Sequence, residues 1–161
     1  MKIHSGHIEC AVAALLNYRV HHIVPNVSWG WDLRHEADMI AVNKSGYVTE
    51  VEIKISKQDL KNDLKKENWH DSKKIHRLAF AVPESLVETC REILPAHVGI
   101  IQVKAMNDHK GEFRCFYAEW VRNCKFDKSK AAINDKQLVD LLRLGCMRIW
   151  SLKIHNNNGK K

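Results

Sequence analysis

Two short apolar segments that carry charged side chains at alternate positions constrain the fold of this chain most. Residues 37–42 read ADMIAV and residues 47–55 read YVTEVEIKI, an alternation that is typical of β-strands. Between them, residues 43–46 (NKSG) supply the polar side chains and the glycine of a tight turn. The three segments together predict a β-hairpin within a mostly buried sheet.

Acidic side chains of the two predicted strands should meet on one face of this hairpin. Because strand side chains alternate, Glu50, Glu52 and Lys54 share a face. The turn brings Asp38 opposite Glu52. Two carboxylates and a lysine on a mostly buried sheet are costly unless a cation neutralises them. Hard divalent cations such as Mg²⁺ bind carboxylate oxygens and keep several waters, which suits phosphodiester hydrolysis.

The spacing of these residues also carries a family resemblance. Asp38, thirteen further residues and then Glu52-Ile53-Lys54 resemble the D…ExK signature of the PD-(D/E)XK nuclease superfamily, with Ala37 in place of the proline. Within that superfamily the chain is most similar to small DNA-repair nucleases of the MmcB type. It is similar, more distantly, to archaeal Holliday-junction resolvases.

The resemblance covers roughly residues 5–103 and implies a fold. That fold is an α/β domain with a restriction-endonuclease-like αβββαβ core, in which helices flank a mixed central sheet. A C-terminal strand and helix are added to the core. We expect a single nuclease-like domain over residues 1–154 and a flexible polar tail over residues 155–161.

The resemblance also implies a metal centre and roles for its residues. Asp38 and Glu52 would hold Mg²⁺ or Mn²⁺, helped by the main-chain carbonyl of Ile53. Glu9, on a predicted helix, matches an acidic residue that many members place before the core. It would bind the metal directly or through water, or only complement the helix N-terminus. Lys54 would position or deprotonate the attacking water, or hold the scissile phosphate.

Helices and strands alternate along the chain, which favours a sheet with some parallel pairing. The expected helices cover residues 5–18, 56–68, 83–94 and 134–150, and the further expected strands cover residues 21–27, 77–82, 98–103 and 113–118. Ser5 and Ser56 are the expected caps of the first two helices. The last helix should complete the core through one apolar face: Leu138, Leu141, Leu142 and, as a further candidate, Met147.

Basic residues are in excess, and several follow the predicted site directly. The net charge of +7 favours an anionic partner such as DNA, although it also serves solubility. Lys57, Lys61 and Lys65 recur every four residues, either as phosphate contacts or as a solvated helix face. Further candidate DNA contacts precede the acidic strand: Trp29, Trp31 and Arg34. The tryptophans would stack on unpaired bases or else pack at the core edge.

Cysteines, histidines and apolar runs indicate the type of protein. The five cysteines form no CxxC pair, and the histidines lack metal-binding spacing, so neither a zinc site nor an iron–sulfur cluster is predicted. We expect no secretion signal and no membrane contact, because no apolar run approaches the ~20 residues that span a bilayer. The expected compartment is the cytoplasm, or the nucleoid if the source is bacterial or a phage. A homodimer is a further expected partner state, because resolvase-like enzymes cut two strands as dimers.

The sequence favours a metal-dependent DNA endonuclease that hydrolyses phosphodiester bonds in repair or recombination. A preference for DNA structure or for single strands follows from the lack of a recognisable base-reading module. Two alternatives stay open: a catalytically silent nuclease-fold module that binds DNA or a protein, and a basic protein-interaction domain. The endonuclease predicts metal-dependent cleavage, the silent module predicts binding alone, and the interaction domain predicts neither.

Overall fold

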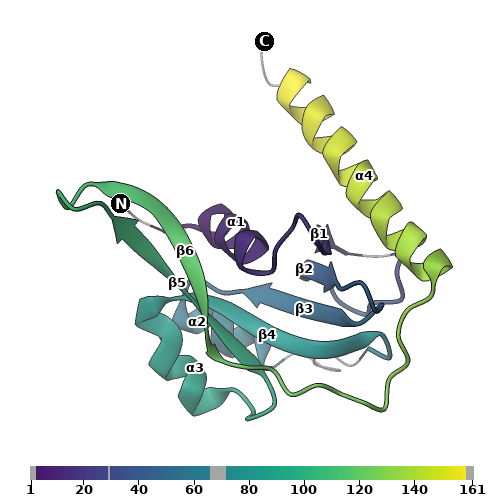
Figure 1. Ribbon diagram of the computed structural model, residues 1–161, viewed down its shortest axis with the longest axis horizontal. Helices are drawn as coiled ribbons and strands as arrows, with labels where there is room; N and C mark the ends of the chain where they lie inside the picture. The colour runs from purple at the N-terminus through teal and green to yellow at the C-terminus, as the bar shows by residue number, and fades with distance from the viewer. Residues whose placement is uncertain (1–2, 29, 66–71, 159–161) are drawn as a thin grey trace.

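Strands hydrogen-bond in chain order into one mixed sheet, which helices flank (Figure 1). The computed structural model describes residues 3–28, 30–65 and 72–158. The described strands are β1 (His22–Val27), β2 (Ala37–Val42), β3 (Val48–Ile53), β4 (Ile75–Pro83), β5 (Gly99–Asn107) and β6 (Phe113–Arg122). The described helices are α1 (Ser5–Leu15), α2 (Lys57–Asp63), α3 (Val87–Ile93) and α4 (Asp135–Asn158), with a 3-10 turn η1 (Glu84–Leu86) before α3.

The pairing of the strands confirms the expected α/β fold with a mixed sheet. β1, β2 and β3 are antiparallel neighbours, β3, β4 and β5 run parallel, and β6 returns antiparallel at the edge. The parallel pairs are joined through α2 and through η1 and α3. The order from α1 to β4 is the αβββαβ order that we expected, and α3, β5, β6 and α4 follow it.

The predicted hairpin is present, and its register places the acidic residues. β2 and β3 pair Met39 with Val51 and Ile40 with Glu50. Asp38 and Glu52 are the next residues outward along the two strands. In the turn, Gly46 has φ +76°, a conformation that favours glycine. The glycine therefore has the role in the turn that the sequence predicts.

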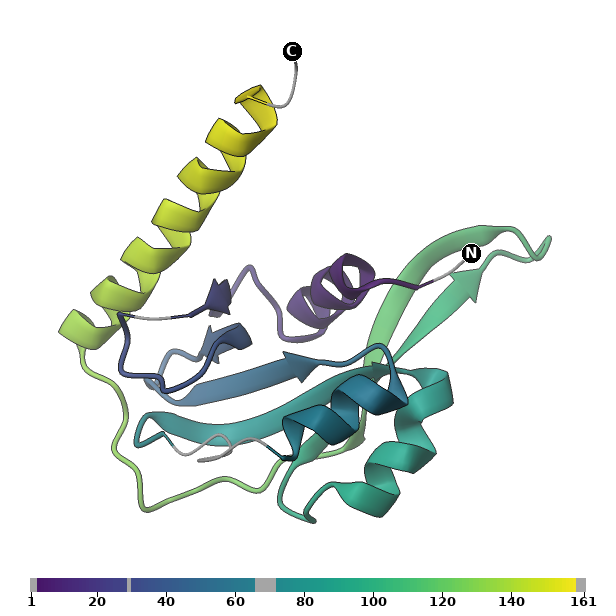
Figure 2. The same ribbon diagram turned by 180° about the vertical axis from the view of Figure 1, so that it is seen from behind.

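The two faces of the sheet are covered by different helices (Figures 1 and 2). On one face, Ile8 and Val12 of α1 join an apolar cluster with Met39 and Val51. On the opposite face lie α2, α3 and the first turns of α4, in two further clusters. Because neighbouring strand residues point to opposite faces, Glu50 and its even-numbered neighbours point away from α1.

The helix α4 contacts the sheet with its first turns and then projects away from it (Figure 1). Leu141 is fully buried, and Leu138 and Leu142 pack against the same cluster. Met147 is 51% exposed, so the expectation that it faces the core is wrong. The reason is that α4 crosses the short edge strand β1 and extends past it, to Asn158. Among the described helices, α4 included, none is both long and apolar enough to span a bilayer.

Some helix boundaries differ from the expected ones. α1 is capped by His4, not Ser5: the His4 backbone N–H donates to His7 Nδ1 at 3.4 Å. It ends at Leu15, and Asn17 then adopts φ 57°, which stops helical continuation. The expected cap of α2 is confirmed, because Ser56 Oγ accepts from the Asp59 N–H at 3.1 Å.

Two expected helices are shorter in the structure. The helix expected over residues 83–94 is divided into η1 and α3. α2 ends at Asp63, and Leu64 and Lys65 form a turn after it. The rest of the expected second helix, residues 66–68, lies outside the described residues. Asp63 is the last residue of α2, and its Oδ1 lies 3.3 Å from Lys54 Nζ, directly after β3.

Replacing Leu141 with Ala should destabilise the protein, because it leaves a cavity between α4 and the sheet. We expect the free energy of unfolding to fall by about 2–4 kcal/mol. Leu152→Ala in the exposed part of the same helix should change it by less than about 0.5 kcal/mol. Denaturation with urea measures both variants, and equal effects would contradict the described placement of α4.

Candidate functional site

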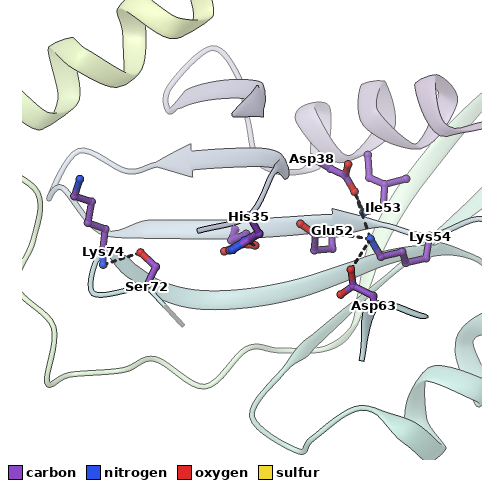
Figure 3. Close-up of polar contacts among 9 residues, drawn as sticks. His35, Asp38, Glu52, Ile53, Lys54, Asp63, Ser72 and Lys74 are labelled. Atoms are coloured by element: carbon purple, nitrogen blue, oxygen red, sulfur yellow. Dashed lines mark hydrogen bonds and ion pairs between the residues drawn. The ribbon is translucent and has the colours of Figure 1, made fainter. Parts of the chain in front are cut away.

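A buried lysine directly after β3 is surrounded by carboxylates (Figure 3). Lys54 Nζ lies 2.6 Å from Glu52 Oε2 and 3.3 Å from Asp63 Oδ1. Asp38 Oδ2 lies 3.8 Å from the same nitrogen. The carboxylates come from β2, β3 and the end of α2. The fold therefore brings together the predicted Asp38, Glu52 and Lys54, and it adds Asp63, which the sequence analysis had not assigned.

Asp38 forms the open side of this cluster. Its Oδ2 accepts a hydrogen bond from the Ile53 N–H at 2.7 Å, which holds the carboxylate beside the last residue of β3. Its side chain is 35% exposed, whereas those of Glu52 and Lys54 are buried. A ligand that approaches from solvent would therefore meet Asp38 first.

A second group of potential ligands lies on the other side of Glu52. His35 Nε2 lies 2.6 Å from Glu50 Oε1. His35, Glu50 and Glu52 each offer one ligand atom, and these atoms lie within 4.8 Å of one another. The sequence pattern assigns no role to His35, since a histidine two residues before a strand shows no metal-binding spacing. The alternation of side chains along β3 predicts that Glu50 and Glu52 share a face, and it is the sequence feature that points to this group.

The electrostatics of the site are dominated by burial. Burial raises the pKa of Glu52 to about 7, and the carboxylates of Asp38 and Glu50 push this pKa in the same direction. The neighbouring Lys54 opposes that rise. Burial alone would lower the pKa of Lys54, but the carboxylates of Glu52 and Asp63 outweigh it and raise this pKa above its usual value. Lys54 is thus protonated at neutral pH.

Glu9 lies on α1, on the Asp38 side of the site. Partial burial raises the pKa of Glu9, and the charge of Asp38 adds to the rise, while Arg148 opposes it. The two carboxylates are therefore close enough to repel each other. A cation between them would relieve this repulsion.

The donor set fits a hard divalent cation. Asp38 and Glu52 supply carboxylate oxygens, the ligand type that Mg²⁺ and Mn²⁺ prefer. The second oxygen of Glu52, Oε1, is buried without a hydrogen-bond partner among the described residues. Because a buried carboxylate oxygen without a partner is costly, a cation on that side of Glu52 would stabilise the folded protein, whereas Oε2, which contacts Lys54, is the oxygen that a cation shared with Asp38 would use.

The candidate DNA contacts differ in their exposure to solvent. Lys57 and Lys61 are exposed on α2, and Lys65 is exposed in the turn after it. Arg34 is exposed and lines a pocket of about 260 Å³ together with basic residues of the segment before β4. Trp31 is buried, and its indole N–H donates to the Gln137 carbonyl at 2.8 Å. Of the two alternatives for Trp31, packing in the core is the one that the structure shows, because its ring belongs to the cluster beneath α4. Trp29 lies outside the described residues.

Known proteins resemble this chain in sequence and in fold. A family model described as "MmcB-like: DNA repair protein MmcB-like" matches residues 4–156. No curated protein matches the chain. A solved structure, "SPO1766 protein of unknown function from Silicibacter pomeroyi", is similar with a TM-score of 0.64 and 17% identity. The similarity covers 100% of this chain and 97% of that chain, and at this identity it shows the fold alone.

The buried carboxylate of Glu52 should make stability depend on pH. Its pKa of about 7 in the folded protein exceeds the ordinary value of 4.5. The folded state therefore binds the proton of Glu52 more tightly than the unfolded state does. The contribution of this group to the free energy of unfolding is fully present below about pH 4.5 and is lost as the pH rises through about 7. The loss is at most ~3 kcal/mol. Glu52→Gln should remove this loss.

Urea denaturation at about pH 5 and about pH 8, with a chelator present, measures the effect. The exposed Glu36→Gln serves as a matched control and should keep the pH dependence of the wild type. Parallel pH profiles for the wild type and Glu52→Gln would show that Glu52 is ionised in the folded state at all these pH values.

Proposed function

The chain belongs to the MmcB-like family of DNA repair proteins, and we propose that it acts in repair as a metal-dependent DNA endonuclease. The observation that carries the proposal is the convergence of Asp38 and Glu52 on Lys54 at the open end of β3. This convergence resembles the D…ExK site of the PD-(D/E)XK nucleases. The αβββαβ order of the core supports membership of that superfamily.

Asp38 and Glu52 would hold Mg²⁺ or Mn²⁺, with the Ile53 carbonyl as a further ligand. When bound, such an ion supplies an activated water and relieves the charge of the transition state. Glu9 would complete the metal shell directly or through water. Glu52 is buried, so its ionised form depends on nearby positive charge.

Lys54 would hold the scissile phosphate. Its side chain is protonated, and the ammonium lies within ion-pair distance of three carboxylates. Of the three carboxylates, that of Asp38 lies farthest from the ammonium and is the most exposed, so a phosphate oxygen can approach the ammonium from that side. Asp63 and Glu52 keep the ammonium in place, so the lysine is oriented before the substrate binds.

DNA would reach the site along α2. Lys57 and Lys61 are exposed on the helix that begins directly after the site, and such lysines contact phosphates without reading bases. We therefore propose a preference for DNA structure or single strands. As further parts of the proposal, the protein works in the cytoplasm or nucleoid, and a second copy of the chain would allow paired cuts in two strands.

A silent module that binds DNA without cutting is the second candidate. The observation that favours it is the hydrogen bond from the Ile53 N–H to Asp38, which occupies one oxygen of the expected metal ligand. A metal would have to bind the other oxygen of Asp38 or displace this bond. Cleavage assays separate the two candidates.

Asp38→Asn, Glu52→Gln and Lys54→Met should each reduce cleavage at least about 100-fold, because each removes a charge that the transition state needs. The assay uses the full chain with Mg²⁺ or Mn²⁺ on single-stranded, duplex and four-way-junction DNA. Glu36→Gln, an exposed site near Asp38, should cleave as the wild type does. DNA binding without metal-dependent turnover would favour the silent module, and equal cleavage by all variants would exclude the proposed site.

Removing the lysines on α2 and in the turn after it should weaken the binding of every DNA sequence to the same extent. The triple variant Lys57→Ala, Lys61→Ala, Lys65→Ala should reduce the slope of log affinity against log salt by about 2–3 units, roughly 0.9 for each lost phosphate contact. The control variant removes the same charge elsewhere: Lys110→Ala, Lys125→Ala, Lys128→Ala. Fluorescence anisotropy over a salt series measures both, and equal slopes would place the DNA on another surface.

A further inference from the structure

We propose that His35, Glu50 and Glu52 form a separate binding site for a divalent transition-metal ion. This site shares Glu52 with the proposed nuclease centre but uses the opposite side of its carboxyl group. The proposal does not depend on DNA cleavage, because the ion would bind whether or not the chain cuts DNA. Neither the family match nor the D…ExK motif assigns a role to His35 or Glu50.

The arrangement of the three side chains suits a metal ion. Their ligand atoms lie within 4.8 Å of one another, and ligands held at about 2.0–2.2 Å from one ion are about 3–4.4 Å apart. His35 Nε2 and Glu50 Oε1 are at hydrogen-bond distance, 2.6 Å. This pair would separate by some tenths of an ångström as the ion replaces the shared proton.

The second oxygen of Glu52 points to a ligand on this side. Glu52 Oε2 contacts Lys54, while Oε1 is buried without a hydrogen-bond partner among the described residues. The Glu52 carboxyl group lies between His35 and Lys54 (Figure 3). Lys54 is directed at Oε2 and at Asp63, so its ammonium does not satisfy Oε1.

Solvent reaches this group at the histidine. The His35 side chain is 14% exposed, whereas Glu50 is fully buried. An ion would therefore enter past the imidazole and bind the two carboxylates beneath it.

The types of ligand atom determine which ion would bind. One imidazole nitrogen with two carboxylates suits Mn²⁺, Zn²⁺ or a similar transition metal. Mg²⁺ and Ca²⁺ prefer oxygen ligands throughout, so they would bind this group more weakly. This preference distinguishes the new site from the Asp38 side of Glu52, where the donors are oxygens.

The first test measures Mn²⁺ binding by the full chain with electron paramagnetic resonance after chelator treatment. His35→Gln should lose one Mn²⁺ site or weaken it at least about tenfold, while His109→Gln, at an exposed position, should bind as the wild type does. Asp38→Asn should keep the His35-dependent site even where it abolishes cleavage. Equal binding by the wild type and His35→Gln would overturn the proposal and leave the His35–Glu50 pair as a structural hydrogen bond.

The second test needs no variant, which matters if His35→Gln fails to fold. Crystals of the wild type soaked in saturating Mn²⁺ should show anomalous density between His35, Glu50 and Glu52. Mg²⁺ in excess should not displace it. Density confined to the Asp38 side of Glu52, or no bound Mn²⁺ at all, would refute the additional site, and the first of these results would still support the nuclease centre.

Discussion

The buried Lys54 ammonium is the interaction on which the polar interior of this sheet depends. It joins Glu52 of β3 to Asp63 of α2 and to Asp38 of β2. Without that charge, the buried carboxylate of Glu52 would face the carboxylates of Asp38 and Asp63, at a cost that exceeds what a single hydrogen bond can offset. The same ion pairs set the position of α2 against the sheet, so the crossover between β3 and β4 and the charge cluster depend on each other.

The two faces of the sheet differ in what they bury. The face under α1 is apolar, with Val51 and Ala79 beneath Ile8 and Val12. The other face holds two apolar clusters, and Glu50 and Glu52 lie on the strand between them. Buried charge of this kind rarely increases stability over an apolar equivalent, which is a reason to look for chemistry at the site.

The family match and the fold make different contributions. The match to DNA repair proteins covers nearly the whole described chain, and the solved structure shares its fold at 17% identity. Fold similarity does not identify a reaction, because one fold supports many activities. We therefore propose hydrolysis, and a second cation at His35, from particular side chains and not from the fold.

The sequence by itself determined the hairpin, because the alternation of residues 37–55 specifies which side chains share a face and the turn specifies the register. It determined the positions of Asp38, Glu52 and Lys54 for the same local reason. Only the tertiary structure brought Asp63 to Lys54 and His35 to Glu50 and Glu52, buried Trp31 and exposed Met147. Periodicity shows which side of an element is apolar, but the packing of elements distant in the chain decides what that side meets.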